Sequence, residues 1–202
     1  MKHFKDSLNG WFSFPVLYKT MVDQATDHSH FVEVGAFLGK SASYMAVEII
    51  NSKKNIKFDC VDLWKVDDDM VRELGWENYI GTGPIQPDYF YNLYLQNIQP
   101  VKHVINNIRS SSVEASKLYE DNSLDFVFID AAHDYKSVYD DLVAWFPKVK
   151  PNGIIAGHDY FDPSVPENVN KFDGLRNAVD TFFNYSPKLQ TNKTEFCWLY
   201  IK

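Results

Sequence analysis

The sequence predicts an α/β fold with a doubly wound, mainly parallel seven-stranded sheet that closes in an antiparallel hairpin. Short apolar runs that suit strands alternate along the chain with apolar patterns of helical period. This alternation is typical of strand–helix–strand units, which place successive strands parallel in one sheet. The last two strand-like runs are joined by a short polar turn, so they are expected to pair antiparallel.

The first third of the chain contains one such unit. A helix is expected over 14–25, ahead of the first strand at 30–34. The pattern then turns helical over 41–50, and a second strand follows at 57–63.

Regular periodicity is lost over 65–100, where an acidic run leads to GTGPIQP and then to the aromatic segment DYFYNLYLQ. The length exceeds an ordinary strand–helix connection and predicts an insertion. Its aromatic residues fit two roles equally well. Trp76 and the tyrosines could form a lid that stacks on sugar or aromatic rings. Alternatively, Phe90, Tyr94 and Ile98 recur at helical spacing and could pack into a core or a dimer interface.

The middle of the chain returns to the strand–helix pattern. A third strand is expected at 103–106 and a helix at 113–119. The run DFVFI gives the clearest strand, 125–129, and the helix over 135–146 is stopped by Pro147.

The closing elements follow the turn KPNG, in which Asn152 is expected to tolerate a left-handed backbone. The strand GIIAG comes next, and a helix is expected over 174–183. Strands at 188–191 and 195–201 would form the hairpin. The whole chain of 202 residues is therefore interpreted as one domain with an insertion at 65–100.

Composition excludes several classes of protein. The formal net charge is −7 and no block is rich in Lys or Arg, which disfavours nucleic acid as a partner. The apolar runs are too short to span a bilayer, and the first residues lack the apolar core of a signal peptide. Cys60 and Cys197 lie in strand-like segments, as buried free thiols do. These features predict a cytoplasmic protein with no membrane partner.

The stretch VEVGAFLGKS, residues 32–41, resembles three kinds of ligand loop. A P-loop needs four residues between its first glycine and the GKS ending, but only three separate Gly35 from Gly39. A dinucleotide loop needs glycine where Phe37 stands. The pattern E-x-G-x-x-x-G-x-S fits at every position. Gly35 permits the tight turn, Gly39 lets the helix begin close to a ligand, and Ser41 is expected to cap that helix.

This pattern, with Glu33 at its head, resembles the first motif of class I S-adenosylmethionine-dependent methyltransferases. Asp62 ends the second strand, where an acid accepts the ribose hydroxyls of a nucleoside. Trp64 follows two residues after Asp62 and could flank the adenine. The resemblance implies that the Ser112-Val-Glu114 stretch contacts the adenine. Trp64 fits an ordinary core position equally well. Lys40 is expected at the surface.

Residues 123–160 carry a more specific resemblance. The IDxxHxY turn, the DLxxWxP helix end, the KPxG turn and the closing GHDY are similar to a methyltransferase family that includes macrocin-type sugar O-methyltransferases. This family resemblance implies a Rossmann-like fold, S-adenosylmethionine as methyl donor and a hydroxyl of a sugar, glycoside or other small metabolite as acceptor. A homo-oligomer is left open.

Four ionisable side chains follow two expected strands at their carboxyl ends: Asp130, His133, His158 and Asp159. Ligands of open α/β sheets bind outside those ends. The resemblance implies that Asp130 and Asp159 hold Mg²⁺, a cation that prefers oxygen ligands. His133 or His158 would then take the proton of the acceptor hydroxyl.

Simpler roles stay open for these residues. Asp130 would orient the donor's amino group, and His133 would cap the next helix or bind Tyr135. Two alternative functions also remain, a non-catalytic module that binds the donor and an enzyme that binds a nucleotide phosphate.

Overall fold

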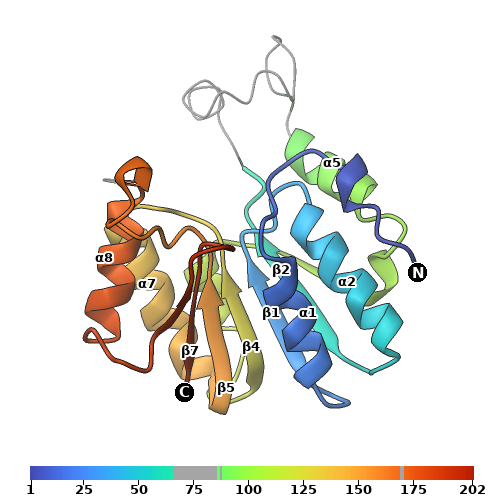
Figure 1. Cartoon of the computed structure of the whole chain (residues 1–202). Helices are drawn as coiled ribbons and strands as arrows, with labels where there is room; N and C mark the ends of the chain where they lie inside the picture. Colours follow the sequence, from blue (N-terminus) through green and yellow to red (C-terminus); the bar gives the residue numbers. More distant parts are fainter. Residues whose placement is uncertain (66–85, 87, 169–170) are drawn as a thin grey trace.

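The computed structural model describes residues 1–65, 86, 88–168 and 171–202 (Figure 1). Its seven-stranded sheet has the order β3-β2-β1-β4-β5-β7-β6. Pairing is parallel from β3 to β5 and antiparallel between β5, β7 and β6, so the predicted doubly wound sheet and its closing hairpin are confirmed. The strands are β1 (His30–Val34), β2 (Lys57–Asp62), β3 (Asn106–Arg109), β4 (Leu124–Ile129), β5 (Val149–Gly157), β6 (Gln190–Asn192) and β7 (Cys197–Ile201).

Helices cover both faces of the sheet (Figure 1). One apolar core joins the sheet to α1, α2 and α5, and a second joins its other face to α6, α7 and α8. The helices are α1 (Pro15–Gln24), α2 (Lys40–Ser52), α5 (Tyr89–Asn97), α6 (Ser112–Ser116), α7 (Tyr135–Trp145) and α8 (Asp173–Phe182). Short 3₁₀ turns are η1 (Lys5–Ser7), η2 (Lys102–Val104), η3 (Phe146–Lys148) and η4 (Pro166–Asn168). No helix of the described residues is long and apolar enough to cross a membrane.

Three local predictions differ from the structure. The third strand begins at Asn106, because its pairing with β2 decides its place, and residues 102–104 form η2 instead. The KPNG segment lies inside β5 at a register shift against β4, and Asn152 there has the expected left-handed backbone (φ 65°). Ser41 lies inside α2, whose N-cap is Gly39 without a side-chain hydrogen bond, so the predicted capping role is wrong.

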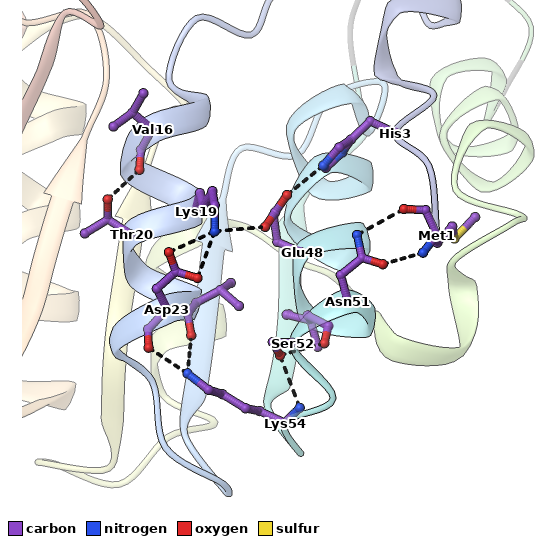
Figure 2. Close-up of polar contacts among 12 residues, drawn as sticks. Met1, His3, Val16, Lys19, Thr20, Asp23, Glu48, Asn51, Ser52 and Lys54 are labelled. Atoms are coloured by element: carbon purple, nitrogen blue, oxygen red, sulfur yellow. Dashed lines mark hydrogen bonds and ion pairs between the residues drawn. The ribbon is translucent and has the colours of Figure 1, made fainter.

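The first residues of the chain are fastened to α2 (Figure 2). The side chain of Asn51 donates to the carbonyl of Met1 at 3.0 Å, and His3 contacts Glu48 at 2.6 Å. Farther on, Lys40 donates to the carbonyl of Gly10 at 3.1 Å, so Lys40 is half-buried and not a free surface residue. These contacts carry the N-terminal segment across the carboxyl ends of the strands.

Candidate functional site

A cavity of about 1270 Å³ opens at the carboxyl ends of the parallel strands. Pockets for a single small ligand are typically about 300–1,000 Å³, so this one has room for two. The strand pairing sets Val34 beside both Val61 and Ile129, and Ile129 beside Gly157. Because these strand ends lie at one edge, the loops that follow them all line the cavity.

The loop after β1 lies directly against the loop after β4. Gly35 has a positive φ of 95°, and a Cβ on it would lie 2.0 Å from the carbonyl oxygen of Asp130. Its backbone N–H donates to the carbonyl of Val61 at 2.9 Å. Gly35 is therefore needed for the close approach of two backbone segments. This approach brings the loop after β1, residues 35–39 and called the donor loop, to the acid–histidine cluster, which is Asp130, His133, His158 and Asp159.

Gly39 makes room for neighbouring side chains and does not bring the helix close to a ligand. It has φ 80° and does not line the cavity, and a Cβ there would lie 2.8 Å from Ile98 and 2.9 Å from Tyr94. The predicted reason for this glycine, closeness to the ligand, is therefore not the one that the structure gives. The neighbours belong to the segment that ends the insertion.

Within the described residues, this segment of the insertion has the core role and not the lid role. Phe90, Tyr94 and Ile98 are fully buried in the core that contains α2, as their helical spacing allowed. Asn97 donates to the carbonyl of Leu38 at 2.9 Å, which fixes α5 to the donor loop. Trp76 and the other proposed lid residues before position 86 lie outside the described residues.

Glu33 lies beneath the cavity. Its side chain is among the most buried of the described residues, accepts a hydrogen bond from Tyr18 at 3.0 Å, and has Cys60 3.6 Å away. Burial raises the pKa of Glu33 to about 7, against hydrogen bonds from Ser41 and Tyr18 that lower it. Glu33 is thus placed to support the loop from below, while Ser41 lines the cavity.

Glu33→Gln is expected to weaken the pH dependence of stability. The raised pKa lets the folded protein hold a proton that the unfolded chain releases near pH 4.5, so stability falls as pH rises from there through about 7. The pKa shift corresponds to a loss of roughly 3 kcal/mol in the free energy of unfolding over this pH range. The glutamine amide does not titrate, so the variant does not show this loss. Urea unfolding of both proteins at about pH 5 and about pH 8 measures this. A difference in stability between them that stays constant with pH would contradict the prediction.

Asp62 ends β2 and lines the cavity, as predicted for a ribose ligand. Its two carboxylate oxygens accept from the backbone N–H of Phe37 at 2.8 Å and of Trp64 at 2.7 Å. Each oxygen has a second lone pair, so hydroxyls can still bind. Asp62 therefore also ties the donor loop to the end of β2.

Trp64 is a core residue. Its ring is buried against Tyr94, with centroids 4.5 Å apart, and its indole N–H donates to the carbonyl of Phe37 at 2.8 Å. It does not line the cavity, so of the two positions left open for Trp64 the structure gives the core one. Leu63, which is exposed, takes the cavity-facing position that sequence reasoning missed.

The acid–histidine residues come together as predicted. Ligand atoms of Asp130, His133 and Asp159 all lie within 4.8 Å of one another, close enough to bind one metal ion together. His133 Nε2 lies 2.8 Å from Asp159 Oδ2. The sequence suggested two carboxylates as ligands, and the structure places an imidazole beside them.

His158 lies between the two carboxylates. Its Nδ1 is 3.2 Å from Asp159 and 3.6 Å from Asp130. Burial would lower the pKa of His158, but the two carboxylates outweigh it and raise the pKa. Burial likewise raises the pKa of Asp159, but His133 and His158 outweigh it and hold that pKa well below its usual value. In this arrangement His158 is a counter-charge for the carboxylates.

The other ring nitrogen of His158 reaches the N-terminal segment. Nε2 lies 2.7 Å from the hydroxyl of Ser13, and the ring packs against Phe14 with centroids 4.8 Å apart. Ser13 and its neighbour Trp11 line the cavity, although no sequence pattern marked either. The N-terminal segment therefore forms one wall of the site.

Ser112 and Val113 line the cavity, whereas Glu114 does not and pairs with Lys117 at 2.6 Å. The expected contact of Glu114 is thus wrong. Asp141 on α7 also lines the cavity. Sequence reasoning did not select it as a site residue, and its only signal was its position as the first residue of the DLxxWxP pattern.

Comparison with known proteins identifies a family for most of the chain. A family model described as a methyltransferase domain matches residues 32–160, which include the loop, Asp62 and the whole acid–histidine cluster. Among curated proteins, no sequence matches the chain significantly.

Solved structures of methyltransferases share the fold. The O-methyltransferase NovP matches with TM-score 0.62 and 14% identity, covering 93% of this chain and 78% of that one. The O-methyltransferase TomG from Streptomyces achromogenes, in complex with SAM, matches with TM-score 0.57 and 10% identity over 93% and 77% of the two chains. A SAM-dependent methyltransferase from Aquifex aeolicus matches with TM-score 0.54 and 14% identity over 93% and 88%.

The family match spans more than half of the chain and contains most of the residues that line the cavity. The chain therefore belongs to this family of methyltransferase domains and has the fold of class I S-adenosylmethionine-dependent methyltransferases.

Proposed function

We propose that this protein transfers the methyl group of S-adenosylmethionine to a hydroxyl oxygen of a small metabolite, with help from a divalent cation. The observation that carries the proposal is the contact between Gly35 and Asp130, which joins the donor loop to the acid–histidine cluster within one cavity. A methyl group moves in line between two bound molecules, so catalysis here depends on holding both in position.

The donor would occupy the side of the cavity formed by the loops after β1, β2 and β3. Gly35, Ser41, Asp62 and Ser112 line that side. Asp62 is placed to accept the ribose hydroxyls, and Asp130 to orient the donor's amino group. Glu33 and Gly39 do not line the cavity; they would support the donor loop from the protein interior.

The residues at the ends of β4 and β5 fit a cation that prefers oxygen. Asp130 and Asp159 would hold Mg²⁺, and His133 would orient the Asp159 carboxylate through its hydrogen bond. The cation would lower the pKa of a bound hydroxyl. His133 would take the hydroxyl proton, while His158 stays the counter-charge of the two carboxylates and Ser13 orients its ring.

Aromatic side chains support a sugar or glycoside as acceptor. Trp11, Phe161 and Phe172 line the cavity, and Phe172 stacks on His133 with centroids 4.1 Å apart. Aromatic faces bind the apolar faces of rings. The O-methyltransferase names of NovP and TomG support oxygen as the accepting atom.

Turnover tests the proposal. We expect conversion of S-adenosylmethionine to S-adenosylhomocysteine in the presence of one member of a panel of glycosides, with a loss of rate in EDTA that Mg²⁺ restores. Donor binding without turnover on any acceptor would favour a non-catalytic module. Calorimetry with S-adenosylmethionine, NAD and ATP tests the remaining alternative, an enzyme that binds a nucleotide phosphate. Tight binding of NAD or ATP without binding of S-adenosylmethionine would overturn the proposal.

A further inference from the structure

Lys171 is a cation at the wall of the cavity that takes no part in the proposed reaction. Its ammonium nitrogen lies over the ring of Phe161, 4.0 Å from the centroid, and both residues line the cavity. Phe161 is 5% exposed, so its ring is a fixed surface that attracts the ammonium. The ring covers one side of the ammonium, which has three N–H donors, so donors stay available to a ligand.

The positive charge of Lys171 has no counter-charge in the described part of the protein. No carboxylate of the described residues forms an ion pair with it. Three acids belong to the same stretch of chain: Asp162, Glu167 and Asp173. The first and the last pair with other cations, each at 2.5 Å, and Glu167 does not line the cavity. A negatively charged ligand would supply the missing charge.

Stacked rings connect Lys171 to the acid–histidine cluster. Phe161 packs against Phe172 with centroids 5.7 Å apart, and Phe172 stacks on His133 at 4.1 Å. His133 is the proposed base, so the acceptor hydroxyl would lie at that end of the row. Lys171 therefore faces the acceptor and not the methyl donor, whose side of the cavity is formed by the loops after β1, β2 and β3.

This wall of the cavity lies beyond the residues that the family model matches. The match covers residues 32–160 and ends before Phe161. Loops outside a shared framework commonly decide which ligand a protein accepts. Lys171 and the two phenylalanines are therefore suited to the choice of acceptor, while the matched residues supply the donor loop and the cluster.

We propose that Lys171 selects an acceptor that carries a negatively charged group, a carboxylate or a phosphate, close to the methylated hydroxyl. This inference rests on the proposed function and narrows its acceptor to acidic sugars or acidic glycosides. A lysine ammonium binds either anion as a compact charge, without the paired geometry of arginine. Lys171 is exposed, so salt screens the contact, which adds a moderate preference to the binding of the ring.

The test uses a glycoside panel in which each neutral hexoside is paired with its 6-phosphate and with the corresponding hexuronide. Methylation of each member is measured in the presence of Mg²⁺. At low salt we expect kcat/KM for an acidic member to exceed that of its neutral partner at least ~5-fold. At about 0.5 M salt this preference should shrink. The two acidic members show whether carboxylate or phosphate is preferred.

Lys171→Met removes the charge and keeps an apolar side chain over Phe161. The preference should fall to ~2-fold or less, while kcat/KM for neutral glycosides stays within ~2-fold of the wild type. Lys171→Arg restores a cation and should restore the preference. Lys188→Met is the matched control, because it changes the net charge equally at an exposed position that does not line the cavity. It should behave as the wild type.

Equal kcat/KM for the neutral and acidic members of every pair would overturn the inference and leave the proposed function intact, as would methylation of neutral members alone. A preference that persists in Lys171→Met would also overturn it, because the anion would then bind the cation of the cluster instead. If no acceptor is methylated, the proposed function fails, and the inference fails with it.

Discussion

Asp159→Asn is expected to lower the rate of methyl transfer at least ~100-fold while changing the affinity for S-adenosylhomocysteine less than ~3-fold. Asp159 contacts His133 and His158 in the acid–histidine cluster, and it follows β5, whereas the donor loop follows β1. The substitution removes one negative charge from the cation site. Asparagine is the suitable replacement because Asp159 has a left-handed backbone (φ 60°) that asparagine tolerates.

Asp162→Asn is the control for this substitution. Asp162 lies three positions farther along the chain, pairs with Lys193 and does not line the cavity. It should keep the wild-type rate. Calorimetry with Mg²⁺ should show weaker binding to Asp159→Asn, by at least ~10-fold. An unchanged rate and Mg²⁺ affinity in Asp159→Asn would contradict the cation model. Lost donor affinity would instead place Asp159 in the donor site.

Gly35→Ala is expected to destabilise the fold by at least ~3 kcal/mol. Two effects add at this position. The positive φ of 95° strains any residue with a Cβ, and that Cβ would lie 2.0 Å from the carbonyl oxygen and 2.6 Å from the carbonyl carbon of Asp130. Backbone atoms between two paired strands cannot move aside as a flexible side chain can, so β1 and β4 would have to separate.

Gly10→Ala separates the two effects. Gly10 has a similar φ of 108°, but the nearest atoms to its added Cβ are 3.9 Å and 4.0 Å away. It should lose only the ~1–2 kcal/mol of backbone strain. Urea unfolding of both variants measures the difference in their free energies of unfolding. If Gly35→Ala does not fold at all while Gly10→Ala does, the prediction is also supported. Equal losses would show that the contact with Asp130 is unimportant.

The sequence predicted the elements whose signals are local. The bounds of β1 were predicted to the residue, and the predicted β4 began one residue late and ended correctly. Apolar runs that end at an acid or a glycine mark strands clearly. The third strand was misplaced because Asn106–Arg109 is polar and has a neighbour on only one side. Its strand character comes from pairing with β2, which no local pattern encodes.

In the candidate site, too, the sequence predicted some features and only the packing decided others. Asp130, His133, His158 and Asp159 were predicted to meet because they follow parallel strands, and they do meet. For Trp64, the sequence left a position beside the adenine and a position in the core equally open. Its side chain turned to the core because Tyr94, thirty positions away, offers a buried aromatic surface there.

By itself, the sequence determined the order of strands and helices, the loop after β1 and the acids at the strand ends. Each of these depends on periodicity or on residue spacing within one segment. Only the tertiary structure decided that Ser13 reaches His158 across 145 residues, that Gly39 makes room for α5, and that Asp141 is buried beside Ser112. Such contacts join segments far apart in the chain, so packing alone fixes them.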